Sequence, residues 1–324
     1  MRRREFIGIV GGATVRLLIV GGASAAAASR VVMLSIAADP SSRLGEFRKQ
    51  MNELGYAEGR NITIEFRSAE GRIERLPALA ETLVREEKAD VILAESTPAA
   101  VAAHQATQTI PFVAFVGVDP VASGLAVTLA RPGGNVTGVA IFADEASPKR
   151  VELVRELAPH AVRLAVAVAT FEKGGKLNLT PVEETASKLG FTVEAIFVDP
   201  DHISETLSPS ILDRFDAFLC VPDVVLTSHM NEIIELLAQT HKPAVFSAHQ
   251  WADNGGLISF GPDLAEASRY WASQLVRVLN GQKASDLPFE RPTKFDLRIN
   301  MRTARAMGIP IPPALLARAG EMIE

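Results

Sequence analysis

The chain has 324 residues, a length that corresponds to about two domains at the usual ~100–200 residues each. Its hydrophobic fraction of 48% is that of a globular protein, and its formal net charge is −5. Because no basic block follows the N-terminus, the sequence lacks the electrostatic signature of a nucleic-acid-binding protein.

Residues 1–28 have the three parts of an export signal peptide. The arginines of 2–4 precede a weakly apolar stretch at 9–20 and then a tract of small residues. Arg3 and Arg4, followed by an apolar pair, favour the twin-arginine route, and a general secretory signal is the alternative. The apolar stretch is shorter than the ~20 residues that span a bilayer, so no retained membrane anchor is expected. Cleavage near Ala28 would release a mature protein into the periplasm.

From Arg30 onward, short β-branched and apolar runs alternate with amphipathic stretches. The runs predict buried strands, and apolar residues spaced three or four apart predict helices. Strands are expected at 30–36, 61–66, 90–94, 112–116 and 136–141, and helices at 43–54, 73–87 and 98–107.

The same alternation restarts in the second half of the chain. Strands are expected at 164–168, 192–198, 217–221, 244–247 and 257–260, and helices at 149–157, 182–189, 204–213, 227–239 and 264–279. Alternating strands and helices form parallel sheets covered on both faces. The sequence therefore predicts an α/β protein with two doubly wound parallel-sheet lobes.

Motifs of catalysis and of cofactor binding do not occur in the sequence. It contains no Gly-x-Gly-x-x-Gly, no lysine-containing phosphate loop and no Gly-x-Ser-x-Gly elbow. The histidines are scattered, and Cys220 is the only cysteine, so a metal site is not expected. Cys220 lies in an apolar run, which is typical of a buried thiol. No cofactor is predicted, and the protein is not expected to be an enzyme.

Ligands of open α/β sheets bind beyond the carboxyl ends of the strands. Six loops are expected there, at 37–41, 95–98, 117–120, 142–145, 222–225 and 248–251. Asp39 and Phe142 lie in two of these loops and are candidate ligand-binding residues.

Polar residues at the starts of two first-lobe helical segments are the next candidates. Ser96 and Thr97 follow a strand and open a helix, where free amides and the helix dipole attract an anion. Asp119 ends another strand and could accept a hydrogen bond from a ligand ammonium or hydroxyl group. The alternative for all three residues is that they only cap helices.

Three candidates belong to the second half. Asp223 lies just past a strand and could accept a hydrogen bond from the far side of a cleft. His249 could hydrogen-bond a ligand, and Trp251 could stack on a planar one, with packing in the core as the alternative for Trp251.

Six segments of the chain carry a family resemblance. They lie at 3–8, 54–61, 119–125, 130–138, 259–263 and from 292 to the C-terminus. The segment at 130–138 contains Arg131-Pro132-Gly133-Gly134-Asn135. In order and spacing these segments resemble bacterial ABC-transporter substrate-binding proteins of the tryptophan/tyrosine-type group, relatives of the leucine/isoleucine/valine-binding proteins. The similarity covers nearly the whole chain.

The resemblance implies a type I periplasmic binding protein fold with a multi-strand hinge. One lobe would comprise 29–143 and 262–290, and the other 144–261 and 291–324, with crossovers near 142–147, 255–263 and 288–294. Ser96 and Thr97 match the segment that holds a ligand carboxylate in this fold, and Asp119 matches the loop after it. Tryptophan-type relatives tend to carry Thr-Asp-Asn where this chain has Pro222-Asp223-Val224. The resemblance therefore does not extend to the recognition of a ligand ammonium group by the second lobe.

The resemblance also implies a function. The protein would bind a small molecule, such as an amino acid, an aromatic acid or a related carboxylate, and deliver it to an ABC permease in the inner membrane. The alternatives are a ligand sensor for a membrane signalling protein and, on the same fold, an enzyme.

Overall fold

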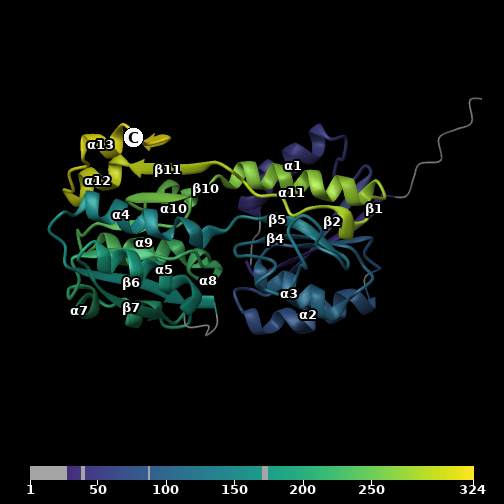
Figure 1. Ribbon diagram of the computed structural model, residues 1–324, viewed down its shortest axis with the longest axis horizontal. Helices are drawn as coiled ribbons and strands as arrows, with labels where there is room; N and C mark the ends of the chain where they lie inside the picture. Colours follow the sequence, from purple (N-terminus) through teal and green to yellow (C-terminus); the bar gives the residue numbers. More distant parts are fainter. Residues whose placement is uncertain (1–27, 38–40, 87, 170–173) are drawn as a thin grey trace, which may run out of the picture.

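The computed structural model describes residues 28–37, 41–86, 88–169 and 174–324, which form two α/β lobes lying side by side (Figure 1). Asp39 and residues 1–27, which hold most of the predicted signal peptide, lie outside the described residues. Within the described ranges, no helix is long and apolar enough to cross a membrane. The predicted fold class, two parallel-sheet α/β lobes, is confirmed.

The first lobe contains a parallel sheet in the order β2-β1-β3-β4-β5. Its strands are β1 (Ser29–Ser35), β2 (Ile62–Ser68), β3 (Val91–Ala94), β4 (Phe112–Val116) and β5 (Val136–Ala140). Its helices are α1 (Ser41–Glu53), α2 (Leu76–Glu86), α3 (Thr97–Ala106) and α11 (Leu264–Leu279), with 3-10 turns η1 (Ile73–Arg75) and η3 (Ala284–Asp286).

Both faces of this sheet are covered, which explains why β3, β4 and β5 are buried at every residue. Val31 and Met33 of β1 share a core with Trp271 of α11 and with residues of α1. Val32 and Leu34 point the other way, into a core built with α2 and α3. Figure 1 shows α1 and α11 on one side of the sheet and α2 and α3 on the other. The helix α11 reaches this lobe from far along the chain.

The second lobe contains a sheet in the order β12-β11-β10-β9-β8-β6-β7. Its strands are β6 (Arg163–Ala169), β7 (Thr192–Val198), β8 (Ala217–Cys220), β9 (Ala244–Phe246), β10 (Ile258–Pro262), β11 (Phe295–Asn300) and β12 (Glu321–Ile323). Its helices are α4 (Ser147–Leu157), α5 (Gly174–Lys188), α6 (Ile203–Thr206), α7 (Pro209–Leu212), α8 (Val224–Ser228), α9 (Met230–Ala238), α10 (His249–Asp253), α12 (Met301–Met307) and α13 (Pro313–Leu316).

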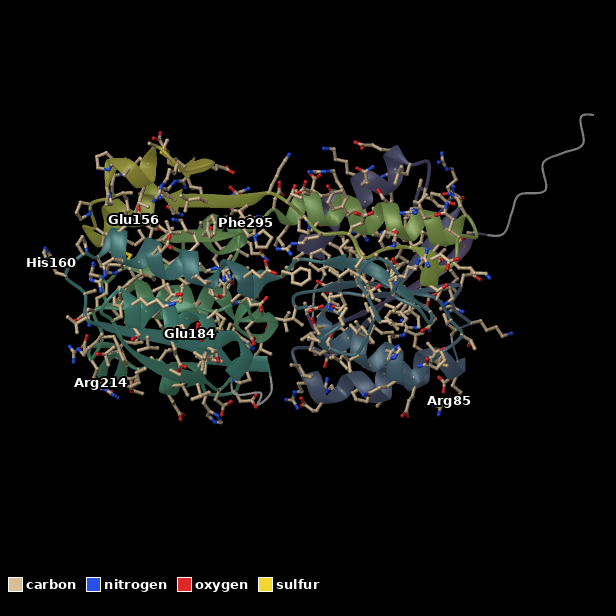
Figure 2. All side chains as sticks on the ribbon, viewed as in Figure 1. Arg85, Glu156, His160, Glu184, Arg214 and Phe295 are labelled. Atoms are coloured by element: carbon tan, nitrogen blue, oxygen red, sulfur yellow. The ribbon has the colours of Figure 1, made fainter. Side chains whose placement is uncertain are left out.

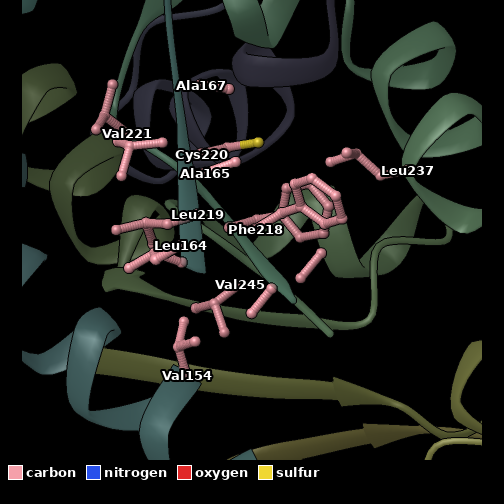
Figure 3. Close-up of a cluster of buried hydrophobic side chains, with 14 of the residues drawn as sticks. Val154, Leu164, Ala165, Ala167, Phe218, Leu219, Cys220, Val221, Leu237 and Val245 are labelled. Atoms are coloured by element: carbon pink, nitrogen blue, oxygen red, sulfur yellow. The ribbon is translucent and has the colours of Figure 1, made fainter. Parts of the chain in front are cut away.

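The core of the second lobe lies under its central strands. Figure 3 shows Leu164, Phe218, Leu219 and Val245 from β6, β8 and β9 packed together. Cys220 belongs to the same cluster and is buried. The strands pair in parallel except at β10 and β11, which are antiparallel. The sequence did not predict this antiparallel pair, because β11 follows a crossing rather than a helix of its own lobe.

In the described residues the chain passes between the lobes three times. It leaves the first lobe after β5 through a 3-10 turn, η2 (Ala143–Ala146). It returns between β10 and α11, and it leaves again between η3 and β11. Phe260 of β10 and Phe295 of β11 stack with ring centroids 5.7 Å apart, and Phe295 lies near the junction of the lobes (Figure 2).

Arg150 joins two of these crossings. The side chain of Arg150 is fully buried. Its Nε donates to the carbonyl of Phe260 at 2.7 Å, and its Nη2 donates to the carbonyls of Ala143 and Ser247 at 3.0 and 3.2 Å. Burial lowers the pKa of Arg150 to about 9, and the nearby Asp144 carboxylate opposes that shift. The guanidinium is therefore still charged at neutral pH and holds both crossings against the second lobe.

Most predicted elements are confirmed, several of them to the residue, such as β4 and α11. The expected helix at 204–213 is instead two short ones, because the residue before Pro209 disfavours helix. The expected helix at 227–239 is also two, separated at His229. The helix α5 begins earlier than predicted, with Pro181 inside it. The sequence reading assigned no elements to α10, α12, α13, β11 or β12.

Candidate functional site

A cavity of about 540 Å³ lies between the lobes. The first lobe contributes Ile36, Glu95, Ser96, Phe115 and Trp271, among others, to its wall. The second lobe contributes Val224, Thr227, Met230, His249 and Gln250, among others. This volume lies within the range of small-molecule sites.

The cavity lies where the strand order predicts it. Ala37 follows β1, Glu95 and Ser96 follow β3, Val224 follows β8 by a short loop, and His249 follows β9. Because the carboxyl ends of parallel strands meet at one edge of a sheet, loops distant in sequence converge there. Four of the six predicted loops supply wall residues, whereas the loops at 117–120 and 142–145 do not.

The start of α3 forms part of the cavity wall. Ser96 is buried, and its Oγ accepts a hydrogen bond from the Ala99 amide at 3.2 Å, so the predicted cap is present. Thr97 Oγ1 accepts from the Gly117 amide at 3.1 Å, which links α3 to the end of β4. Pro98 has no N–H, and the Ala100 amide bonds to the Ser96 carbonyl at 2.9 Å. Of the first helical amides, only that of Thr97 makes no hydrogen bond within the described residues.

Glu95 comes directly before this helix and also lines the cavity. The residue is only 4% exposed, and the buried Ser35 hydroxyl donates a hydrogen bond to its carboxylate. Two other carboxylates of the cavity wall lie nearer the solvent. Glu46 is 3.9 Å from both Lys49 and Arg269.

The third wall carboxylate, Glu70, forms an ion pair with Arg75, and its side chain is 66% exposed. It therefore belongs to the solvated rim of the cavity rather than to its interior. Glu95 is thus the most deeply buried of the three wall carboxylates.

An aromatic surface closes the first-lobe side of the cavity. The rings of Phe115 and Trp271 meet edge to face with centroids 5.6 Å apart. Trp271 is held in place because its Nε1 donates to the Val113 carbonyl at 3.0 Å and its ring packs on Phe47 at 4.9 Å. Neither aromatic residue was predicted to belong to the site. Trp271 lies on α11, whose apolar spacing indicated only a core helix.

His249 and Gln250 form part of the second-lobe wall. Burial lowers the pKa of His249, and the Arg298 guanidinium lowers it further, against the carboxylates of Asp253 and Asp296. His249 is therefore neutral at neutral pH. Gln250 also lines the wall, although its side-chain Oε1 is buried and accepts no hydrogen bond from any described residue.

Asp223 and Trp251 do not line the cavity. Asp223 caps α8, because its Oδ1 accepts from the amides of Val225 and Leu226 at 2.7 and 3.0 Å. Burial raises the pKa of Asp223, and those two amide hydrogen bonds oppose the shift. Trp251 is fully buried and stacks on Phe246 with centroids 4.9 Å apart, so its ring packs in the core.

Asp119 and Phe142 also lie away from the cavity wall. Asp119 Oδ1 accepts from the Val121 amide at 2.8 Å, which fixes a turn. Phe142 has a left-handed backbone with φ of 44° at the first crossing, and Arg291 lies over its ring at 4.5 Å. The structure therefore brings Ser96 and His249 to one cavity and leaves Thr97, Asp119, Phe142, Asp223 and Trp251 outside its wall.

No group of three or more His, Cys, Asp or Glu side chains in the described ranges could hold a metal ion.

Residues 32–323 match the family described as ABC transporter substrate binding protein. A curated relative, the tyrosine-binding protein of Clostridioides difficile, is 30% identical over 263 residues, which cover 81% of this chain and 75% of the relative.

Two solved structures allow the arrangement of the two lobes to be compared with a ligand-bound and an open relative. An ABC domain from Streptococcus pneumonia in complex with L-Trp superposes with a TM-score of 0.81 at 26% identity, over 92% of this chain and 100% of that one. The ligand-free, open structure of a substrate binding protein from Clostridium difficile gives a TM-score of 0.64 at 26% identity, over 91% and 99%. At equal identity, the lobes superpose better on the ligand-bound protein.

Proposed function

Since the chain belongs to the ABC transporter substrate-binding protein family, we propose that it binds a small amphipathic molecule of amino-acid type between its lobes. The observation that carries this proposal is the cavity itself, which combines the aromatic surface of Phe115 and Trp271 with the polar groups of Ser96 and His249. Aromatic amino acids and related small molecules fit that combination. The names of the relatives, a tyrosine-binding protein and an L-Trp complex, support the same class.

The proposed role is delivery of this ligand to an ABC permease in the inner membrane. The export signal predicted at 1–28 would place the protein in the periplasm, where such a permease would meet it. The proposed lobes are 29–143 with 262–290 and 144–261 with 291–324. Each lobe carries one of the two sheets, which supports this division.

Ligand binding would close the two lobes on each other. Residues of both lobes form the cavity wall, so only a closed state makes every contact with the ligand. A ligand shifts the population toward the state that it binds more tightly. The better superposition on the L-Trp complex than on the open, ligand-free protein supports a closed arrangement here.

Calorimetry and solution scattering test the proposal together. L-Trp and L-Tyr are titrated into the mature protein, and the radius of gyration is measured with and without each amino acid. We expect saturable binding, a higher melting temperature and a smaller radius of gyration, without conversion of the ligand. A tight ligand that leaves the scattering profile unchanged would contradict the closing hinge.

A further inference from the structure

We propose that Glu95 binds a positively charged amino group of the ligand, so that the cavity selects amines and amino acids over the corresponding acids without an amino group. This inference rests on the proposed function, because it concerns the ligand of the same cavity. It assigns ammonium recognition to the first lobe, at a residue that the sequence reading did not single out.

The position of Glu95 distinguishes it from the other acids considered. Asp223 lies outside the cavity wall and uses its Oδ1 to cap α8. Asp119 also lies outside the wall and is committed to the Val121 amide. Glu95 lines the cavity, and the residue is only 4% exposed.

The two rim carboxylates are less suited to select a cation. Glu46 and Glu70 keep 42% and 66% of their side chains exposed. Solvent screens their charges, so a ligand cation gains little from them. A cation that reaches Glu95 leaves water, where a charge-assisted hydrogen bond is stronger.

The helix that follows Glu95 offers little to an anion. Anion sites at helix N-termini depend on several free amides. Among the first amides of α3, only that of Thr97 makes no hydrogen bond within the described residues. Pro98 lacks an N–H, the Ala99 amide bonds to Ser96 Oγ, and the Ala100 amide bonds to the Ser96 carbonyl. A ligand carboxylate placed there would also lie beside Glu95, and two like charges at one site disfavour each other. The amino end of a ligand is therefore the end that this part of the cavity accepts.

The chemistry of an ammonium group suits the Glu95 side of the cavity. This group carries three donors and no acceptor, which matches the acceptor-only carboxylate of Glu95. The aromatic surface of Phe115 and Trp271 would contact the apolar part of the same molecule.

Three probes with one phenol ring test the inference by calorimetry: tyramine, L-tyrosine and 3-(4-hydroxyphenyl)propanoate. The protein variants are the wild type, Glu95→Gln and the control Glu70→Gln, which makes the same change at the exposed rim. In the wild type we expect both amines to bind and the propanoate to bind at least about 10-fold more weakly. Glu95→Gln should weaken tyramine binding about 10- to 100-fold, whereas Glu70→Gln should stay within about threefold of the wild type.

The possible results separate this inference from the proposed function. If the propanoate binds the wild type as tightly as tyramine, or if Glu95→Gln keeps full affinity for tyramine, the inference is wrong and the proposed function stands. If none of the three probes binds and L-Trp also fails to bind, the inference and the proposed function are both wrong about the ligand class. If Glu95→Gln does not fold, the comparison of tyramine with the propanoate on the wild type decides alone.

Discussion

Arg150 Nε donates a 2.7 Å hydrogen bond to the carbonyl oxygen of Phe260, and this contact fastens α4 to the strand by which the chain leaves the second lobe. The same guanidinium donates to the carbonyl of Ala143, at the other crossing. A Cβ added at Gly261 would lie 2.1 Å from the Ser247 carbonyl oxygen, so the backbone passes tightly here as well. The base of the hinge is therefore a closely packed unit with one buried cation at its centre.

Replacing Arg150 should destabilise the protein strongly. Arg150→Met would leave three buried carbonyls without their donor, and we expect a loss of roughly 3–5 kcal/mol of folding free energy. Arg150→Lys should lose less folding free energy, because the lysine ammonium keeps the positive charge. It still loses some, because it lacks the planar set of N–H donors of the guanidinium. Urea unfolding measures both, with Arg85→Met on the exposed face of α2 as the control. An unchanged midpoint for Arg150→Met would contradict this role.

The hydroxyls of Ser96 and Thr97 should contribute to stability through local capping. The double variant Ser96→Ala with Thr97→Val removes the acceptors of the Ala99 and Gly117 amides. We expect it to lose about 2–3 kcal/mol, as the sum of a helix cap and a second hydrogen bond. Chemical denaturation checks this, and a loss below about 0.5 kcal/mol would show that other groups replace both acceptors.

Acid should destabilise the protein partly through His249. The pKa of His249 in the folded protein is lowered from 6.5, so the contribution of this residue to the free energy of unfolding is fully present above pH 6.5. It is lost as the pH falls from there toward the folded pKa, since the unfolded chain takes up the proton first. We therefore expect His249→Gln to lose less stability than the wild type between pH 7.5 and about 5.5.

His202 provides a control of opposite sign for that experiment. Its hydrogen bond with Asp199 raises the pKa of His202, so its contribution is present below the unfolded pKa and is lost as the pH rises. His202→Gln should therefore lose more stability on acidification than the wild type does. Equal pH profiles for the His249→Gln variant and the wild type would contradict the lowered pKa.

Cys220 should be unreactive in the folded protein. Burial raises the pKa of its thiol to about 12, so almost no thiolate exists at pH 8. Absorbance measurements with Ellman's reagent should detect the thiol only after the protein unfolds, at a rate that follows global unfolding. Rapid reaction without denaturant would show that the second-lobe core opens locally.

Export should depend on the two arginines that start the chain. Changing Arg3 and Arg4 to lysine should leave the precursor in the cytoplasm if the protein follows the twin-arginine route. Cell fractionation with an antibody to the mature protein measures the distribution. An undiminished periplasmic fraction would exclude that route and leave general secretion as the alternative.

The alternation of apolar and amphipathic segments was enough to predict the five strands of the first sheet and β6 to β10 of the second, because a strand buried on two faces is largely apolar. The strand-end rule also predicted where the cavity lies, since it depends only on topology. It could not show which side chains point into the cavity. Ser96 and Asp223 both follow strands, and only Ser96 lines the wall.

The elements that were missed depend on contacts between distant segments. Trp271 reaches the cavity because α11 packs against the first lobe after the chain has built most of the second, and no local pattern reports that. The strand β11 exists because it pairs antiparallel with β10, and β12 because it pairs with β11. Glu95 was passed over because a single acid before a helix is common in sequences, and only its burial beside the cavity sets it apart.

The late arrival of α11 also sets the order in which the protein can assemble. Phe47 and Met33 are covered by Trp271 and its neighbours, which the ribosome adds only after the whole strand set β6 to β10. A growing chain that ends before residue 264 therefore keeps one apolar face of its first sheet exposed. The first lobe cannot finish folding on its own during synthesis, although domains commonly fold in order from the N-terminus. Nearly the entire chain must be made before either half is complete, so the two lobes mature together.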